Sequence, residues 1–229
     1  MNHLLFSGKV KLADVILADY RLLNVLPRFG ISLGFGEKSV EEVCRRHEVP
    51  LNLFLLICNV HTFDDYLPAE EELKSFRVED LIAFLRKSHN YYIGERIPDL
   101  QAKLIQMIGC CEGKYARSFE RFFRDYRQEV VNHFDYEESV VFPYIDGLLH
   151  SGNTGAYHIE QFEENHTNIQ EKLNDLKNII IKYLPGNCPS LQQNEILFDL
   201  FLLEDDLNKH TLLEDKILVP LVLQLEKQA

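Results

Sequence analysis

The sequence has no long apolar run and has few basic residues. The first absence argues against a membrane span and the second against nucleic-acid binding. No segment approaches the roughly 18 uncharged apolar residues expected of a membrane-spanning helix. The N-terminal segment MNHLLFSGKVKLADV reaches Lys9, Lys11 and Asp14 too early to form a signal-peptide core. The 24 Lys and Arg are outnumbered by 36 Asp and Glu, giving a formal net charge of −12, whereas nucleic-acid phosphates require a basic surface. We therefore expect a cytoplasmic protein that binds neither membranes nor nucleic acid.

Cysteines are few and have no regular spacing. Their odd number and the lack of any C-x-x-C pair argue against a disulfide framework and indicate reduced thiols. The five are Cys44, Cys58, Cys110, Cys111 and Cys188. Two interpretations of the adjacent Cys110 and Cys111 are open: a redox or metal pair, or a helix end near Gly113, which we favour.

Helical periodicity is the strongest signal that the sequence does contain. Apolar residues make up 46% and charged residues 26% of the 229 residues, a composition typical of a globular chain. From about residue 75, apolar residues recur at helical spacing in four segments, 77–108, 115–149, 157–184 and 191–228. Four long amphipathic helices joined by short breaks predict an all-α fold, an up-down-up-down four-helix bundle.

The first third of the chain has a different pattern. We expect a small helical N-terminal domain over residues 1–72 and the bundle over residues 73–229, with the boundary in the acidic segment DDYLPAEEEL. Within the first domain, SVEEVCRRHEVPLNLFLLICNV is expected to form two short helices separated at Pro50. The glycine-rich segment RFGISLGFGEKS before them is expected to form a turn.

An internal repeat runs through the bundle segment. A shift of 77 residues brings histidine onto histidine, acid onto acid and proline onto proline, although the two halves are otherwise dissimilar. The aligned pairs are His89 with His166, Glu129 with Asp206, His133 with His210, Glu137 with Glu214, Glu138 with Asp215, and Pro143 with Pro220. Because only these residue types are retained between the halves, we infer that a chemical role constrains them.

The repeated residues predict a site for two metal ions. In each H-x-x-x-E pair the two side chains share one helix face, beside the apolar stripe, where carboxylates are costly to bury unless they bind a cation. We expect imidazoles as terminal ligands and carboxylates as bridges between ions ~3.5–4 Å apart. The predicted ligands are His89, His133, His166 and His210 as terminal groups, with Glu137 and Glu214 as bridges. Iron, manganese and zinc all suit this set, and an oxo or hydroxo bridge with a small exogenous ligand would complete it.

Several neighbouring residues leave two interpretations open. Pro143 and Pro220 either bend their helices symmetrically near the site or mark frayed helix ends. Glu129 and Asp206, one turn before a ligand histidine, either accept hydrogen bonds from the ligands or line a path to the metals, or else belong to a solvated helix face. The aromatic residues near the ligands are expected to belong to the core rather than to a gas-binding pocket; they are Tyr91, Tyr92, Phe119, Phe122 and Phe123.

The order H…HxxxE…H…HxxxE resembles the hemerythrin-like cation-binding domains. Within that group, HFDYEESVVFPYI and HTLLEDKILVPLV resemble the H-x-x-x-E-E-x-x-(L/V)-F-P blocks of the iron-sulfur cluster repair di-iron proteins, the RIC family. The resemblance covers roughly residues 75–229 and implies a di-iron centre on the four histidines and two glutamates named above. Val219 departs from the pattern, because phenylalanine is usual there.

The N-terminal segment, over about residues 12–60, also resembles the small helical domain of RIC proteins. That domain normally carries a Cys-Cys pair, which this chain lacks near Leu33 and Gly34. Cys44 and Cys58 do not replace it by position. Functions that depend on this thiol pair are therefore in question for this chain.

The resemblance implies three functional hypotheses. The leading one is a non-haem di-iron protein that restores iron-sulfur clusters after nitrosative or oxidative stress, with nitric oxide or O₂ as ligand and iron-sulfur proteins as partners. The second is a hemerythrin-like protein that binds or senses O₂ or NO, a role that the missing Cys-Cys pair favours. The third is an oxidase or peroxidase built on the same centre, although no proton donor is identifiable and an enzymatic role stays open. A homodimer is also an expected assembly.

Overall fold

The computed structural model describes residues 5–73, 75–109, 114–151, 157–163, 169–183 and 189–227. Over these residues the repeating secondary structure is helical, and the sole extended pairing is an isolated antiparallel bridge between Lys11 and Ser39. The predicted all-α fold, with a helical bundle and small N-terminal helices, is therefore confirmed. The predictions for Cys110, Cys111, His166 and Cys188 fall outside the described residues.

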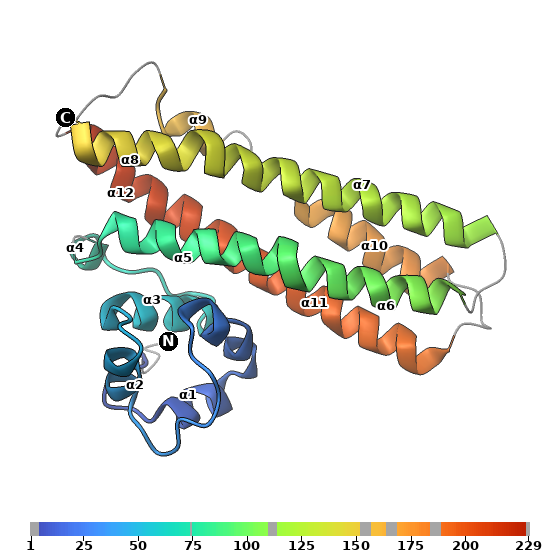
Figure 1. Cartoon of the computed structure of the whole chain (residues 1–229), viewed down its shortest axis with the longest axis horizontal. Helices are drawn as coiled ribbons and strands as arrows, with labels where there is room; N and C mark the ends of the chain where they lie inside the picture. The colour runs from blue at the N-terminus through green and yellow to red at the C-terminus, as the bar shows by residue number, and fades with distance from the viewer. Residues whose placement is uncertain are drawn as a thin grey trace. The chain divides into compact units, whose positions relative to one another are not determined.

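The bundle is built from four helical stretches (Figure 1). Among the described residues, a π turn interrupts the first, second and fourth of them. The first stretch is α5 (Val78–Tyr91), the π turn η3 (Tyr92–Arg96) and α6 (Ile97–Gly109). The second is α7 (Lys114–Tyr136), the π turn η4 (Glu137–Val141) and α8 (Phe142–Ser151). The third contains α9 (Glu160–Glu163) and α10 (Ile169–Tyr183). The fourth is α11 (Ser190–Leu213), the π turn η5 (Glu214–Leu218) and α12 (Val219–Glu226).

A proline follows each π turn at the same distance. Pro98, Pro143 and Pro220 each lie two residues after the last residue of a π turn. A proline ring crowds the carbonyl four residues earlier in an α-helix and supplies no N–H, and a turn widened to an i→i−5 bond relieves that crowding. The helix continues past Pro143 as α8 and past Pro220 as α12, so neither proline marks a frayed helix end.

The chain divides by backbone contacts into two compact units, Met1–Ser88 with Leu212–Gln228, and His89–Thr211. In the second unit, α6, α7, α10 and α11 bury a continuous core of Leu, Ile and aromatic side chains. Tyr92, Phe119 and Phe123 belong to that core, while Tyr91 and Phe122 pack against it. The prediction that these aromatic residues serve the core is confirmed. A domain boundary at residue 72 stays a prediction.

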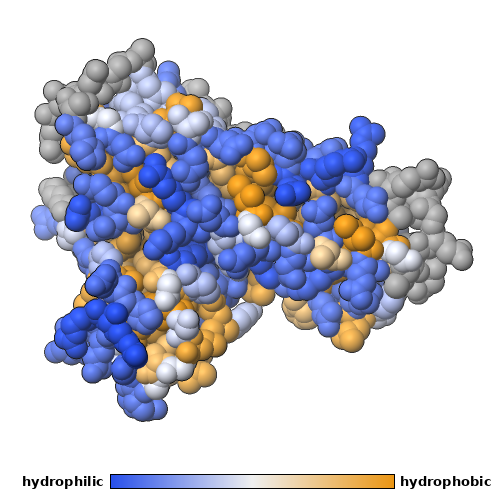
Figure 2. Space-filling view, in the orientation of Figure 1, coloured by the Kyte–Doolittle hydropathy of each residue, from blue (hydrophilic) through white to orange (hydrophobic). Residues whose placement is uncertain are grey.

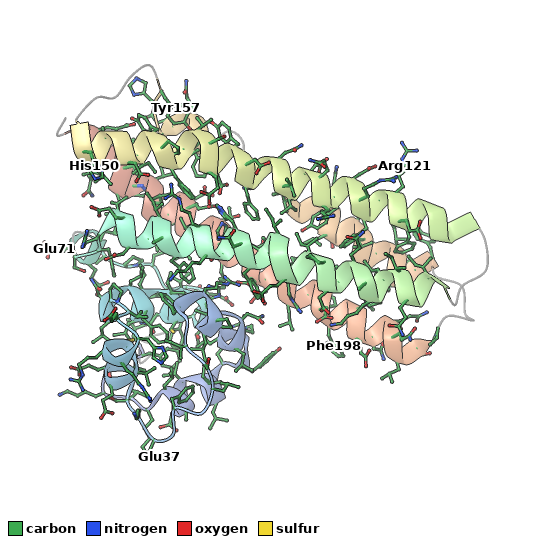
Figure 3. The ribbon with its side chains drawn as sticks, in the orientation of Figure 1. Glu37, Glu71, Arg121, His150, Tyr157 and Phe198 are labelled. Atoms are coloured by element: carbon green, nitrogen blue, oxygen red, sulfur yellow. The ribbon has the colours of Figure 1, made fainter. Side chains whose placement is uncertain are left out.

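The outer faces of the bundle helices are largely polar, as their amphipathic sequences require. The space-filling view shows hydrophilic residues over most of the visible face of these helices, with smaller hydrophobic areas between them (Figure 2). Arg121 on α7 and Phe198 on α11 extend outward from their helices (Figure 3). Phe198 is 69% exposed.

The N-terminal part of the first unit is made of short helices. In chain order these are α1 (Leu12–Ala18), the 3₁₀ turns η1 (Tyr20–Asn24) and η2 (Leu26–Phe29), α2 (Val40–Arg46), α3 (Leu51–Thr62) and α4 (Glu70–Leu73). Ser39 and Glu42 form a capping box that starts α2. Pro50 is the N-cap of α3, so the predicted separation of two helices at this proline is confirmed. The glycine-rich turn between η2 and α2 contains Gly30, Gly34 and Gly36, all with positive φ.

Candidate metal centre

Four of the predicted ligands lie together inside the helices. His89, Glu137, His210 and Glu214 are all buried, and each offers one ligand atom that lies within 4.8 Å of the others. Two of the four, Glu137 and Glu214, are the first residues of π turns. The internal repeat therefore selected four residues whose side chains lie close together in the structure.

Glu137 connects two different histidines through its two carboxylate oxygens. Its Oε1 lies 2.7 Å from Nε2 of His133, and its Oε2 lies 2.9 Å from Nε2 of His89. The Glu137 side chain is fully buried. A carboxylate whose two oxygens face different imidazole nitrogens is compatible with a bridging role, in which each oxygen and its neighbouring imidazole would bind the same ion at adjacent positions.

His89 has neighbours at both ring nitrogens and on the faces of its ring. Its Nε2 faces the cluster, 3.2 Å from Nε2 of His210, while its Nδ1 lies 2.9 Å from Oε1 of Glu138. The ring is stacked against Phe134, with centroids 4.2 Å apart and an interplanar angle of 14°. Phe142 lies nearly parallel to the same ring, with a centroid distance of 5.6 Å. The imidazole is therefore held by aromatic packing and by polar contacts at both nitrogens.

Electrostatics explain why this cluster is chemically unusual. Glu137 and Glu214 are both 0% exposed, and two ionised carboxylates in a low-dielectric interior are strongly unfavourable unless positive charge lies next to them. Neutral imidazoles cannot supply that charge, but divalent cations bound by imidazole and carboxylate do. The buried His/Glu donor set therefore fits a metal site, and its chemistry suits iron, manganese or zinc.

The two acidic residues that precede the histidines have different surroundings. Glu129 accepts a hydrogen bond from Nζ of Lys172, which belongs to α10. Asp206 is 6% exposed, and its backbone carbonyl accepts a hydrogen bond of 3.3 Å from the hydroxyl of Tyr92. The role of these two acids beside the ligands stays a prediction, as does ligation by His166.

Sequence reasoning assigned no role to Glu138, although the structure places it in direct contact with a predicted ligand. The signal was present in the repeat, since an acidic residue follows the bridging glutamate in both halves, Glu138 in one and Asp215 in the other. What the sequence could not supply is the contact between Glu138 and His89, which are 49 positions apart. Phe134 and Phe142 also contact His89, and the sequence alone assigned neither of them a role at the site.

The fold and the donor set together define a metal-binding helical-bundle protein. Residues 78–222 match the family model described as the hemerythrin HHE cation-binding domain, which is more than half of the chain, so the chain belongs to the hemerythrin HHE family. No curated protein matched the sequence. Among the described helices, none combines the length and apolar character needed to cross a bilayer.

Proposed function

We propose that this chain is a non-haem di-iron protein that binds a small diatomic molecule, O₂ or NO. The observation that carries the proposal is the bridging position of Glu137, whose two oxygens face the Nε2 atoms of His133 and His89 at 2.7 and 2.9 Å. This geometry suits two adjacent ions better than one, because each oxygen has its own imidazole partner. Glu214, as the repeat counterpart of Glu137, supplies the second bridge in this proposal.

The chain's own residues prepare the site in three ways. The six predicted ligands would hold two iron ions without filling their coordination, and the bound iron pair would supply redox chemistry and affinity for O₂ or NO. Phe134 and Phe142, both at most 1% exposed, place apolar rings around His89 and limit the access of water. The bridging carboxylates bring the negative charge that offsets the charge of the ions.

Within this class, repair of damaged iron-sulfur clusters is the physiological role we propose first, and we place it in the cytoplasm. The support is the resemblance of both ligand blocks to those of the RIC family, together with small N-terminal helices before the bundle. In this role the centre would respond to nitrosative or oxidative stress and act on an iron-sulfur protein.

One observation supports O₂ or NO binding without repair as the second candidate. Near the place where RIC proteins carry their Cys-Cys pair, Gly34 has φ of +95°, a conformation that an L side chain such as cysteine adopts only with strain. Cys44 and Cys58 are buried, and burial raises the pKa of the Cys44 thiol to about 12, so neither offers a reactive thiolate. The N-terminal helices thus lack accessible thiol chemistry among their described residues.

The first test is metal content. The protein should be loaded with Fe²⁺ without oxygen, desalted, and analysed for iron per chain before and after exposure to air. We expect two iron ions per chain and, after oxidation, the near-ultraviolet absorption of a bridged di-iron centre. A matched control is Asp125→Asn, which removes an exposed carboxylate of α7 paired only loosely with Arg121, at 3.8 Å, and should bind iron normally. One ion or none per chain would contradict the di-iron proposal.

The second test separates the two candidates. Iron-loaded protein should be mixed with an iron-sulfur hydratase inactivated by NO, and hydratase activity should be followed over time against an iron-free sample. Recovery that requires the iron-loaded chain would support repair. An iron-loaded chain that gives no recovery but forms a stable, reversible O₂ or NO complex would exclude repair and support the binding role.

A further inference from the structure

Nδ1 of His89, the ring nitrogen that faces away from the cluster, contacts Glu138. Glu138 is not one of the predicted ligands. We propose that Glu138 is a positioning residue, which fixes the tautomer and ring orientation of His89 so that its Nε2 lone pair faces the metal centre. The inference rests on the proposed metal-binding function and extends it to a residue outside the ligand set.

The first support is the geometry around one imidazole ring. Nδ1 of His89 lies 2.9 Å from Oε1 of Glu138, while Nε2 on the other side of the ring points at Oε2 of Glu137 and Nε2 of His210. A neutral imidazole carries a single N–H, so a hydrogen bond donated by Nδ1 leaves Nε2 as the nitrogen with the lone pair. Only that tautomer, in this orientation, can bind a cation at the cluster.

The second support is that one helical stretch supplies three contacts of the ring. Phe134, Glu138 and Phe142 follow one another at intervals of four residues across α7, η4 and α8, and all three contact His89. Residues at this spacing lie on one helix face. The two rings fix the plane of the imidazole, and the carboxylate between them fixes its rotation within that plane.

The third support is the difference in exposure across the contact. The side chain of His89 is 4% exposed, whereas that of Glu138 is 37% exposed. The carboxylate therefore lies between the buried ring and solvent, so the contact with His89 does not require a second fully buried polar group. Because Glu138 is partly exposed, its truncation leaves no large buried cavity, and the helices should fold without it.

The experiment compares three variants with the wild-type chain, using Zn²⁺ as the probe because it is redox-inactive and suits the same donors. Glu138→Ala removes the acceptor, Glu138→Gln keeps an acceptor oxygen without the charge, and Asp125→Asn removes a charge from an exposed position of the same helix. Zn²⁺ affinity should be measured by competition with a chelator. The ring nitrogens of His89 should be followed by ¹⁵N NMR in Zn²⁺-loaded protein, with thermal unfolding of the metal-free chains as a folding control.

We expect Glu138→Ala to lower Zn²⁺ affinity by about 10- to 100-fold, the usual effect of losing a partner of a ligand histidine. Glu138→Gln should recover most of that loss, and Asp125→Asn should match the wild type. The Nδ1–H signal of His89 should be slow to exchange with water in the wild type and in Glu138→Gln, and should broaden in Glu138→Ala. Metal-free unfolding temperatures should be similar for all four proteins.

Two results would overturn the inference while leaving the metal centre intact. One is a wild-type chain and a Glu138→Ala variant that bind Zn²⁺ within twofold of each other. The other is a Glu138→Gln variant as weak as Glu138→Ala, which would assign the effect to charge rather than to the tautomer. A wild-type chain that binds no Zn²⁺ would instead overturn the proposed metal centre, and this inference with it.

Discussion

The two ligand helices of the repeat, α7–η4–α8 and α11–η5–α12, keep the same features in the same order but in different surroundings. In both, a histidine precedes a glutamate by four residues, the glutamate starts a π turn, and a proline follows. The neighbours differ, because Phe142 and Glu138 of the first helix correspond to Val219 and Asp215 of the second. The invariant part is therefore the ligand pair with its widened turn, and the packing around it is adjustable.

The largest expected effect is on the bridging glutamates, and it tests whether the two halves are equivalent. Glu137→Gln and Glu214→Gln each replace a fully buried carboxylate by an amide that neither neutralises nor bridges the ions. We expect each to lower metal affinity by more than about 100-fold, equivalent to about 2.7 kcal/mol, as measured by chelator competition. The metal-free variants should unfold at higher temperature than the metal-free wild type, because a buried charge has been removed. A loss confined to one glutamate would show that the halves are not equivalent.

The next effect concerns Phe142, a position at which the two halves differ. Phe142→Val gives the first helix the residue found at the corresponding position of the second, Val219. Phe142 is fully buried and lies parallel to the His89 ring, so the smaller side chain should leave a cavity. We expect a loss of about 2 kcal/mol in the free energy of unfolding, by comparison with larger truncations of buried aromatic residues. Chemical denaturation measures this free energy. An unchanged midpoint would mean that neighbouring side chains repack into the cavity.

A smaller effect is expected at the prolines, where the halves agree. A proline forced into an ordinary α-turn costs about 3 kcal/mol, so its replacement by alanine would stabilise the protein by a similar amount. Because a π turn precedes Pro143 and Pro220, we expect Pro143→Ala and Pro220→Ala to be destabilising by less than about 1 kcal/mol, through greater freedom of the unfolded chain. Chemical denaturation of the two variants measures the change in the free energy of unfolding. An increase of about 3 kcal/mol would contradict the proposal that the π turn relieves the crowding.

The smallest expected effect concerns two buried thiols of the N-terminal helices, outside both ligand helices. It is a change in how the free energy of unfolding depends on pH. Burial raises the pKa of Cys44 from an ordinary value of 9.0 to about 12 and raises the pKa of Cys58 as well. Between pH 9 and 12 the folded state therefore binds more protons than the unfolded state, and the free energy of unfolding should fall as pH rises through this range. Replacement of both thiols by alanine should flatten that slope. Alkylation followed by peptide mapping should also find Cys44 and Cys58 unreactive in the folded protein at neutral pH.

The bundle and most of its donor set were predictable because both depend on periodicity. Apolar residues at helical spacing predict the four stretches, and the offset between repeats selects His89, Glu137, His210 and Glu214 from the other histidines and acids. The π turns were not predictable, since an i→i−5 bond reflects competition between a proline ring and a carbonyl rather than a residue preference. The contact of Glu138 with His89 depends on the register between two helices, which one helix's sequence does not encode.

The π turns also connect the metal centre to two particular amide groups. The N–H of Phe142 donates to the carbonyl of Glu137, and the N–H of Val219 donates to the carbonyl of Glu214. In the proposed centre, each of these glutamates would hold an ion with its side chain, while its main chain closes a widened turn. Deuterium uptake at these two amides should consequently slow when the ions bind, which measures metal occupancy without an absorption spectrum or an activity assay.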